Sequence, residues 1–317
     1  FKNGKEIIDR LAWRFKSVGE LKVTGQESMD KLVSKMKETG ASALMLCGLT
    51  STQRNDIIKY CVENDIKAYV RPNIGDFIIS NVKTVQMANL PVMICERATP
   101  SLFYVAMKRA MDIVISLIGL VIASPFLLIT AIAIKAYDHG PVFYKQVRLT
   151  KNGREFKILK FRSMKVDAEK DGVARLSSEN DDRITPVGKV IRACRIDELP
   201  QLINILKGDL AVVGPRPERP EIAAQYVEEM PEFSLRLQVK AGLTGYAQVY
   251  GKYNTEPYDK LQMDLMYVNQ MGLVSDVKII LATIKILFMP ESTEGIAAGQ
   301  TLSLIHISEP TRLRCIS

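Results

Sequence analysis

The stretch from Ile113 to Ile134 contains no charged residue, and it limits the folds open to this chain more than any other feature. A helix needs about 20 apolar residues to enter and cross the hydrocarbon core of a bilayer, and this run is long enough. Ser124 and Pro125 stand in its middle. One alternative is a kinked transmembrane helix, in which the Ser hydroxyl and neighbouring groups satisfy the backbone that Pro leaves unpaired. The others are a re-entrant helix–break–helix and a buried core helix.

Positive charge lies on both sides of the run. The flanking cations are Lys108 and Arg109 before it, and Lys135, Lys145, Arg148, Lys151, Arg154 and Lys157 after it. Because Lys and Arg concentrate on the cytoplasmic side of a membrane, a spanning helix would leave one basic flank outside. A re-entrant segment keeps both flanks in the cytoplasm. The sequence therefore favours a re-entrant hairpin over residues 101–138, broken at Ser124 and Pro125.

Upstream of the run, helix-like and strand-like segments alternate. The segments are helical patterns at Ser28–Thr39 and Thr52–Asn64, and apolar strands at Ala43–Cys47, Ile66–Val70 and Leu90–Cys95. This alternation predicts βαβ units around a parallel sheet, so we assign residues 1–100 to a partial Rossmann-like domain. No G-x-G-x-x-G follows a strand, and the sequence therefore predicts no dinucleotide site there.

The formal net charge of +8 favours an anionic partner, which would be nucleic acid, a phosphorylated substrate or an anionic membrane surface. The five cysteines lack C-x-x-C spacing and the two histidines are His139 and His306, so no pattern predicts a zinc site. This cysteine usage fits a reducing, cytosolic setting. The 317 residues suffice for about two domains. The chain begins with Phe1, which predicts a fragment.

A pair of adjacent carboxylates, Asp197 and Glu198, gives the chain its most chemically useful feature. The pair stands just before Pro200, and Pro is tolerated only in the first turn of a helix, so a helix should begin close to the pair. The start of a helix favours ionised carboxylates and attracts phosphate. An ordinary N-cap has the same appearance, so the pair alone leaves both interpretations open.

Cations near the pair favour the functional interpretation. Arg192 precedes it, and Arg216 lies between two prolines in a turn whose rigidity lowers the entropic cost of presenting a guanidinium to a phosphate. Residues 156–162 form a predicted strand with Lys160 and Arg162 on one face, where they would meet a diphosphate or line a solvated edge. Two carboxylates among several cations predict phosphoryl chemistry with a divalent metal.

Three features lie further along the chain. The glycine-punctuated segment Ala241–Gln248 predicts either a close approach to a nucleotide or sugar, or a plain turn. Val277–Met289 is too short to span a membrane and too apolar for an ordinary surface, so we expect an amphipathic helix in the membrane interface. Residues 302–317 resemble a translated sequencing-library adapter. We predict a non-native tail there and leave it out of the fold and function.

With these motifs in view, the chain resembles the bacterial polyprenyl-phosphate glycosyl-1-phosphate transferases, the monotopic enzymes that initiate exopolysaccharide, capsule and O-antigen synthesis. The resemblance runs from about Met107 to Gly295. Its motifs are KRAMDIV ahead of the Ser-Pro pair, Gly140–Arg148, Phe156–Met164, Ile196–Leu202, Lys207–Leu210, Val213–Pro217 and Gly242–Val249. Ala241 and Tyr246 depart from the Pro and Trp of many members, which leaves fine substrate preference open.

The resemblance implies an α/β protein whose mixed α/β catalytic domain covers residues 139–296 and acts at the cytoplasmic face of the bacterial inner membrane. It would transfer a sugar 1-phosphate from a UDP-sugar to undecaprenyl phosphate and release UMP. In family terms Asp197 is the nucleophile of a covalent phosphosugar intermediate and Glu198 its acidic partner. Both are candidate Mg²⁺ ligands, and Glu198 is alternatively a proton-handling group.

The remaining site residues follow from the same resemblance. Arg192 and Arg216 match phosphate-binding positions, the strand cations Lys160 and Arg162 join them as candidates, and the Ser124-Pro125 pair matches the membrane break. Two other classes stay as alternatives. A non-catalytic membrane-anchored binding or regulatory protein leaves the acidic pair unexplained. A nucleic-acid-binding protein leaves the apolar run unexplained, so we expect no nucleic acid partner. The sugar, and whether the protein forms a homo-oligomer, stay open.

Overall fold

The computed structural model describes residues 18–21, 28–39, 43–47, 51–80, 82–87, 90–97, 99–166, 168, 181–251, 255–287 and 312–316. The chain forms two compact units that divide between Asn73 and Ile74, earlier than the predicted boundary near residue 100. Ile74 belongs to the second unit because its side chain is buried in one apolar cluster with Phe233 and Leu261.

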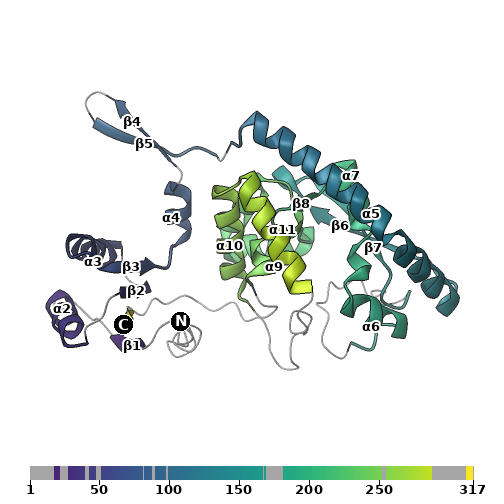
Figure 1. Cartoon of the computed structure of the whole chain (residues 1–317), viewed down its shortest axis with the longest axis horizontal. Helices are drawn as coiled ribbons and strands as arrows, with labels where there is room; N and C mark the ends of the chain where they lie inside the picture. Colours follow the sequence, from purple (N-terminus) through teal and green to yellow (C-terminus); the bar gives the residue numbers. More distant parts are fainter. Residues whose placement is uncertain are drawn as a thin grey trace. The chain divides into compact units, whose positions relative to one another are not determined.

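The first unit is built on a four-stranded sheet with strand order β1-β10-β2-β3 (Figure 1). Its elements are β1 Val18–Leu21, α2 Ser28–Thr39, β2 Ala43–Cys47, α3 Ser51–Glu63, β3 Lys67–Val70 and β10 Arg312–Ile316. The parallel pairing of β2 with β3, joined through α3, confirms one predicted βαβ unit. The Rossmann-like assignment of the whole domain stays a prediction.

The C-terminal segment enters this sheet. Residues 302–317 were expected to take no part in the fold, yet Arg312–Ile316 form β10, which pairs antiparallel with β1 on one side and β2 on the other. The expectation is therefore wrong for β10. The other residues of the segment, His306 among them, lie outside the described residues, and the origin of the segment stays a prediction.

The apolar segment at Leu90–Cys95 does not join a parallel sheet. Leu90–Ile94 form β5, which pairs antiparallel with β4, Lys83–Met87, in a separate two-stranded sheet. All five residues of β5 are exposed. This part of the prediction is wrong, because a short apolar run has the same appearance in a buried parallel strand and in a hairpin. A short helix, α4 at Ile74–Ile79, precedes the hairpin.

The second unit, Ile74–Leu302, is a mixed α/β domain with one long apolar helix. After α4, β4 and β5, its elements are α5 Leu102–Asp138, β6 Phe143–Leu149, η1 Lys151–Gly153, β7 Glu155–Phe161, α6 Pro186–Ala193, η2 Ile196–Glu198, α7 Gln201–Lys207, β8 Ala211–Val213, α8 Pro220–Glu229, η3 Pro231–Gln238, β9 Gly242–Thr244, α9 Tyr246–Val249, α10 Pro257–Asn269 and α11 Leu273–Leu287. β6 pairs antiparallel with β7, and β8 parallel with β9. The core joins β7, α7, β8, α10 and α11.

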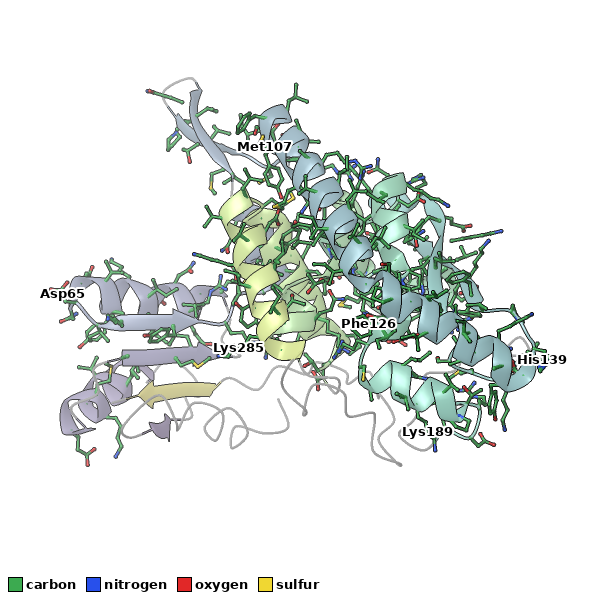
Figure 2. The ribbon with its side chains drawn as sticks, turned by 45° about the vertical axis from the view of Figure 1, so that its right-hand side comes forward. Asp65, Met107, Phe126, His139, Lys189 and Lys285 are labelled. Carbon is green, nitrogen blue, oxygen red and sulfur yellow. The ribbon has the colours of Figure 1, made fainter. Side chains whose placement is uncertain are left out.

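Helix α5 continues without a break through Ser124 and Pro125, as Figure 2 shows between the labelled Met107, Phe126 and His139. Pro125 has no N–H to donate to the carbonyl of Val121. The Ser124 hydroxyl donates to that carbonyl instead, at 2.8 Å. The predicted helix–break–helix is therefore corrected to a continuous helix, because a side-chain donor replaces the missing backbone bond.

Among the described residues, α5 is the one helix long and apolar enough to cross a membrane. Only 17% of its most apolar stretch is buried, which excludes a buried core helix. Its outer face exposes large apolar side chains such as Leu117, Val121 and Ile129. Helix α11 likewise exposes Val274 and Leu281. The unit therefore has the composition of a membrane-associated α/β domain.

Both ends of α5 contact the same unit. At the N-terminal end, Lys108 Nζ lies 2.9 Å from Oδ2 of Asp276, a fully buried residue of α11. The Arg109 guanidinium donates to the carbonyls of Ile205 and Leu206 at the end of α7. At the C-terminal end, Asp138 forms an ion pair with Arg162. The helix consequently runs alongside the rest of the second unit rather than away from it (Figure 1).

Candidate active site

The acidic pair lies in a tight turn between two helices. Helix α6 ends at Ala193, and Arg195 then adopts the left-handed conformation with φ 54°, which costs a non-glycine residue backbone strain. Asp197 and Glu198 follow in the 3₁₀ turn η2. Helix α7 begins only at Gln201, because Pro200 lacks the N–H that would continue the hydrogen-bond ladder. The predicted helix start thus lies one short turn after the pair.

Glu198 is held between two cations. Its Oε1 atom accepts from Lys160 Nζ at 2.7 Å and from Arg216 Nη2 at 2.9 Å. Burial alone would raise the pKa of Glu198, but Arg216 and Lys160 outweigh it and hold the pKa well below its usual range. Glu198 therefore carries a fixed negative charge. The proton-handling alternative is disfavoured, because taking up a proton would break two charge-assisted bonds.

Asp197 has the opposite environment. Burial raises its pKa, Lys160 opposes this shift, and the neighbouring Glu198 carboxylate adds to it. Among the described residues, neither oxygen of Asp197 accepts a hydrogen bond or forms an ion pair. Asp197 is therefore a carboxylate of raised basicity without a partner among the described residues. The cations beside it would attract a phosphate.

The two carboxylates fit a magnesium ion. Glu198 uses Oε1 for its ion pairs and leaves Oε2 open, beside the open Asp197 carboxylate. Within the described part of the chain, no group of three or more His, Cys, Asp or Glu side chains could hold a metal. Mg²⁺ in phosphoryl-transfer sites commonly takes one or two carboxylates and completes its shell with substrate phosphate and water. The donor set matches that pattern.

The four predicted phosphate-binding cations divide into two groups. Lys160 and Arg216 contact Glu198, and Arg192, in the last turn of α6, lowers the pKa of Asp197 through its charge. These three cations lie around the acidic pair. Arg162 instead follows the end of β7 and pairs with Asp138 at the end of α5, with its side chain 7% exposed. Two of its nitrogens, Nε and Nη1, are buried without a partner among the described residues.

Three glycines pack backbone against backbone next to Arg216. A Cβ atom at Gly242 would lie 2.1 Å from the Gly214 nitrogen, and one at Gly245 would lie 2.3 Å from the Gly214 oxygen. These glycines therefore allow β8 and β9 to approach at the turn that carries Arg216. This favours the plain structural interpretation of residues 241–248. The neighbouring segment at 252–254 lies outside the described residues.

Two arginines that were not predicted as site residues bind the turn carrying Arg216. Arg236 of η3 donates through Nη2 to the Arg216 carbonyl at 2.7 Å, and it forms a buried ion pair with Asp264 of α10 at 2.8 Å. Arg148 donates through Nη1 to the Pro217 carbonyl at 3.1 Å. Arg236 lies in a segment that gave no motif, and its contact with Arg216 depends on tertiary packing. Arginine side chains commonly bond the carbonyls of turns, and this general tendency does not predict the particular contact between Arg236 and Arg216.

A cavity of about 260 Å³ lies beside this turn, against Arg216, Glu218 and Arg236. Its other walls are mostly apolar, from the end of β6, α8, η3 and the residues just before β9. Neither Asp197 nor Glu198 lines it. The turn therefore presents Arg216 between the acidic pair on one side and an apolar hollow on the other.

Comparison with known proteins gives one family and several relatives. A family described as bacterial sugar transferase matches residues 103–290. The chain is 42% identical, over 59% of its length and 44% of the relative, to the UDP-N-acetylgalactosamine-undecaprenyl-phosphate N-acetylgalactosaminephosphotransferase of Aeromonas hydrophila. It is 36% identical, over 67% of its length and 47% of the relative, to the UDP-glucose:undecaprenyl-phosphate glucose-1-phosphate transferase of Escherichia coli K12. It is 41% identical, over 56% of its length and 93% of the relative, to exopolysaccharide production protein PSS of Rhizobium leguminosarum. The chain spans about half the length of the first two relatives.

Proposed function

Because the chain belongs to the bacterial sugar transferase family, we propose that it transfers a sugar 1-phosphate from a UDP-sugar to undecaprenyl phosphate and releases UMP. The family predicted from the motifs is confirmed. The names of the Aeromonas hydrophila and Escherichia coli relatives support this reaction. The observation that carries the proposal is the open Asp197 carboxylate beside Glu198, which Lys160 and Arg216 hold at 2.7 and 2.9 Å.

In the proposed mechanism Asp197 is the nucleophile. One of its carboxylate oxygens bonds to the phosphorus that carries the sugar, and the bond from that phosphorus to the bridging oxygen breaks, so UMP leaves with the electron pair. A phosphate oxygen of undecaprenyl phosphate then attacks the same phosphorus and releases Asp197. The covalent step separates the encounter with a water-soluble donor from the encounter with a lipid confined to the bilayer.

A carboxylate that attacks a diphosphate meets like charge, and the cations around the pair reduce this repulsion. Lys160, Arg192 and Arg216 place positive charge where the phosphates would lie. Glu198 would orient Lys160 and Arg216 and, with Asp197, would hold Mg²⁺. When bound, Mg²⁺ supplies charge neutralisation of the diphosphate. Because the pKa of Asp197 is raised, its carboxylate is more basic than usual, and it also takes up a proton at a higher pH than usual.

We also propose that both ends of the continuous helix α5 stay at the cytoplasmic face, with its exposed apolar face immersed in the membrane surface, and that α11 lies in the interface. The contacts at both ends of α5 support this topology. Lys108 binds Asp276, and Asp138 binds Arg162, both within the one folded unit. A helix that crossed the bilayer would place one of these charged ends on the opposite side from its partner. The exposed apolar faces of α5 and α11 would then contact lipid.

The test of the reaction measures UMP release from a panel of UDP-sugars in the presence of undecaprenyl phosphate and Mg²⁺. We expect Asp197→Asn to lower the rate by about 10³-fold or more, because the nucleophile is lost. Without the lipid, a UDP-sugar labelled with ³²P in its sugar-bearing phosphate should label the wild-type protein and leave Asp197→Asn unlabelled. Asp182→Asn, at an exposed carboxylate, serves as the matched control and should behave as wild type.

Two outcomes would contradict the proposal. Undiminished UMP release or protein labelling in Asp197→Asn would exclude this residue as the nucleophile. A wild-type protein that releases no UMP from any UDP-sugar would instead favour the non-catalytic, membrane-anchored binding protein.

The topology is tested by cysteine labelling. Cysteines replace Ala106 and His139, which flank the apolar run and are exposed, in a background with Cys95 and Cys194 changed to Ser. We expect a membrane-impermeant maleimide to label both positions from the cytoplasmic face and neither from the periplasmic face. Labelling of the two positions from opposite faces would show that α5 spans the membrane.

A further inference from the structure

The turn that carries Arg216 has every carbonyl from Pro215 to Glu218 in a hydrogen bond. The donors, in order, are the Gly242 amide at 2.9 Å, Arg236 Nη2 at 2.7 Å, Arg148 Nη1 at 3.1 Å and the Leu149 amide at 2.9 Å. The outer two donors are backbone groups of neighbouring strands. The inner two are arginine side chains, and they hold the carbonyl of Arg216 and the one that follows it.

Arg236 is itself fixed on several sides. Its side chain is 6% exposed, and Nη2 lies 2.8 Å from Oδ2 of Asp264, whose side chain is 3% exposed. Its guanidinium lies over the ring of Phe233, 4.8 Å from the centroid. Nη1 is 3.9 Å from Glu218 Oε1. A buried ion pair of this kind gives little net stability, so its value lies in the geometry that it imposes.

Arg216 needs such support because its side chain is long and 44% exposed, and its side-chain partner among the described residues is Glu198. An exposed guanidinium on a loose turn would sample many orientations, and each would lower the chance of meeting a phosphate. Pro215 and Pro217 limit the backbone but remove two amide donors, so the turn depends on donors from elsewhere.

We propose that Arg236, oriented by Asp264, is a positioning residue, with Arg148 as its second support, that fixes the Arg216 backbone so that the Arg216 guanidinium meets Glu198 and the substrate phosphate. This inference rests on the proposed function. Neither arginine needs to touch the substrate in this role. Arg236 and Asp264 come from η3 and α10, so two elements remote in the chain set the position of one catalytic cation.

The proposal predicts that Arg236→Lys acts only through Arg216. Lysine keeps the charge but lacks the planar guanidinium that places Nη2 2.7 Å from the Arg216 carbonyl and 2.8 Å from Asp264. We expect kcat for UMP release to fall by about a hundredfold, the usual cost of misplacing a reacting partner by about 1 Å. In an Arg216→Ala background the same change should lower kcat by less than about twofold. Arg183→Lys, in a partly buried pair with Asp181, is the control and should leave kcat unchanged.

Deuterium exchange supplies a readout that does not depend on the reaction. Exchange of the peptide spanning residues 210–219 should become faster in Arg236→Lys and in Asp264→Asn, and should stay unchanged in Arg183→Lys. If Arg236→Lys fails to fold, Arg148→Lys gives the same test, because it removes the bond to the Pro217 carbonyl.

Four outcomes separate failure of this inference from failure of the proposed function. Equal loss of kcat from Arg236→Lys with and without Arg216 would overturn the positioning role, as would unchanged exchange in residues 210–219. Full activity of Arg216→Ala would show that there is no catalytic cation to position, and would overturn it as well. If the wild type released no UMP but exchange were still faster in Arg236→Lys, the proposed reaction would be overturned. The support of the turn by Arg236 would nevertheless be established.

Discussion

Asp197 and Glu198 are neighbours in the chain, yet their surroundings push their pKa values in opposite directions. Glu198 gains two cationic partners, whereas Asp197 is half-buried with no hydrogen-bond partner among the described residues. Such divergence is how paired carboxylates take different roles in one site. In the proposed mechanism it separates Glu198, a permanently charged residue that orients cations, from Asp197, a more basic residue that attacks.

This difference predicts opposite pH effects from two substitutions. Asp197 must be ionised to attack, so the rate should fall on the acid side as it takes up a proton. Lys160 lowers the pKa of Asp197, so Lys160→Met should move this acid limb to higher pH. Glu198 raises that pKa, so Glu198→Gln should move the limb to lower pH. The pH dependence of kcat/KM for UMP release measures both shifts.

Both substitutions should also lower the maximal rate, by roughly a hundredfold, because each removes part of the charge arrangement around the phosphates. Lys157→Met is the matched control for Lys160→Met. It lies on the same strand but is exposed, and we expect its profile to coincide with that of the wild type. Shifts of the same sign in Lys160→Met and Glu198→Gln would show that the acid limb does not report Asp197.

At the scale of single elements, α5 shows how one hydroxyl preserves a helix around a proline. The Ser124 hydroxyl bonds the Val121 carbonyl that Pro125 cannot reach. Ser124→Ala should therefore lower the free energy of unfolding by about 1 kcal/mol. In a Pro125→Ala background residue 125 recovers its amide donor, and Ser124→Ala should then cost close to nothing. Chemical unfolding in detergent micelles measures all four proteins of this cycle. Equal costs in the two backgrounds would contradict this role of the hydroxyl.

Much of the element pattern was predictable because it depends on local periodicity. Ser28–Thr39 and Ala43–Cys47 have the predicted bounds, and the helix predicted at residues 52–64 is shifted by one residue at each end. The strand β7 buries Phe156 and Ile158 on the predicted face, and Lys160 continues that face. Amphipathic spacing determines such features before any tertiary contact forms.

Apart from the break in α5, the failed predictions depend on contacts between distant segments. The apolar sequence of β5 suits a buried core strand as well as an exposed hairpin strand. Only its pairing with β4 distinguishes the two. The alternation of side chains placed Arg162 on the same face as Lys160, but Arg162 pairs with Asp138 at the end of α5 and not with the acidic pair. The Asp197–Glu198 pair was recognised from composition and motif, whereas the supports of Arg216 come from η3, α10 and β6, which no local pattern links.

At the scale of the second unit, helix α4 lies upstream of α5 in the chain and packs against the residues that support the site. Ile74 packs in one cluster with Phe233, Leu261 and Leu265, and Phe233 lies under the Arg236 guanidinium. We expect Ile74→Ala to cost about 2–4 kcal/mol of unfolding free energy, because it leaves a cavity in that cluster. Ile78→Ala, four residues on in the same helix and 49% exposed, should cost less than about 0.5 kcal/mol. Equal costs in chemical unfolding would show that α4 does not contribute to the cluster.

The contact between Lys108 and Asp276 joins residues that are 168 positions apart. At a synthesis rate of roughly 5–20 residues per second, Asp276 emerges on the order of ten seconds after Lys108. For that interval the nascent helix has its apolar face complete, while Asp112 and Lys108 still lack the groups that later cover them. On the proposed topology the membrane would be the first partner that α5 meets, and the polar groups along its other face would oppose full passage across the bilayer. The order of translation would then favour a membrane-bound intermediate onto which the rest of the second unit folds.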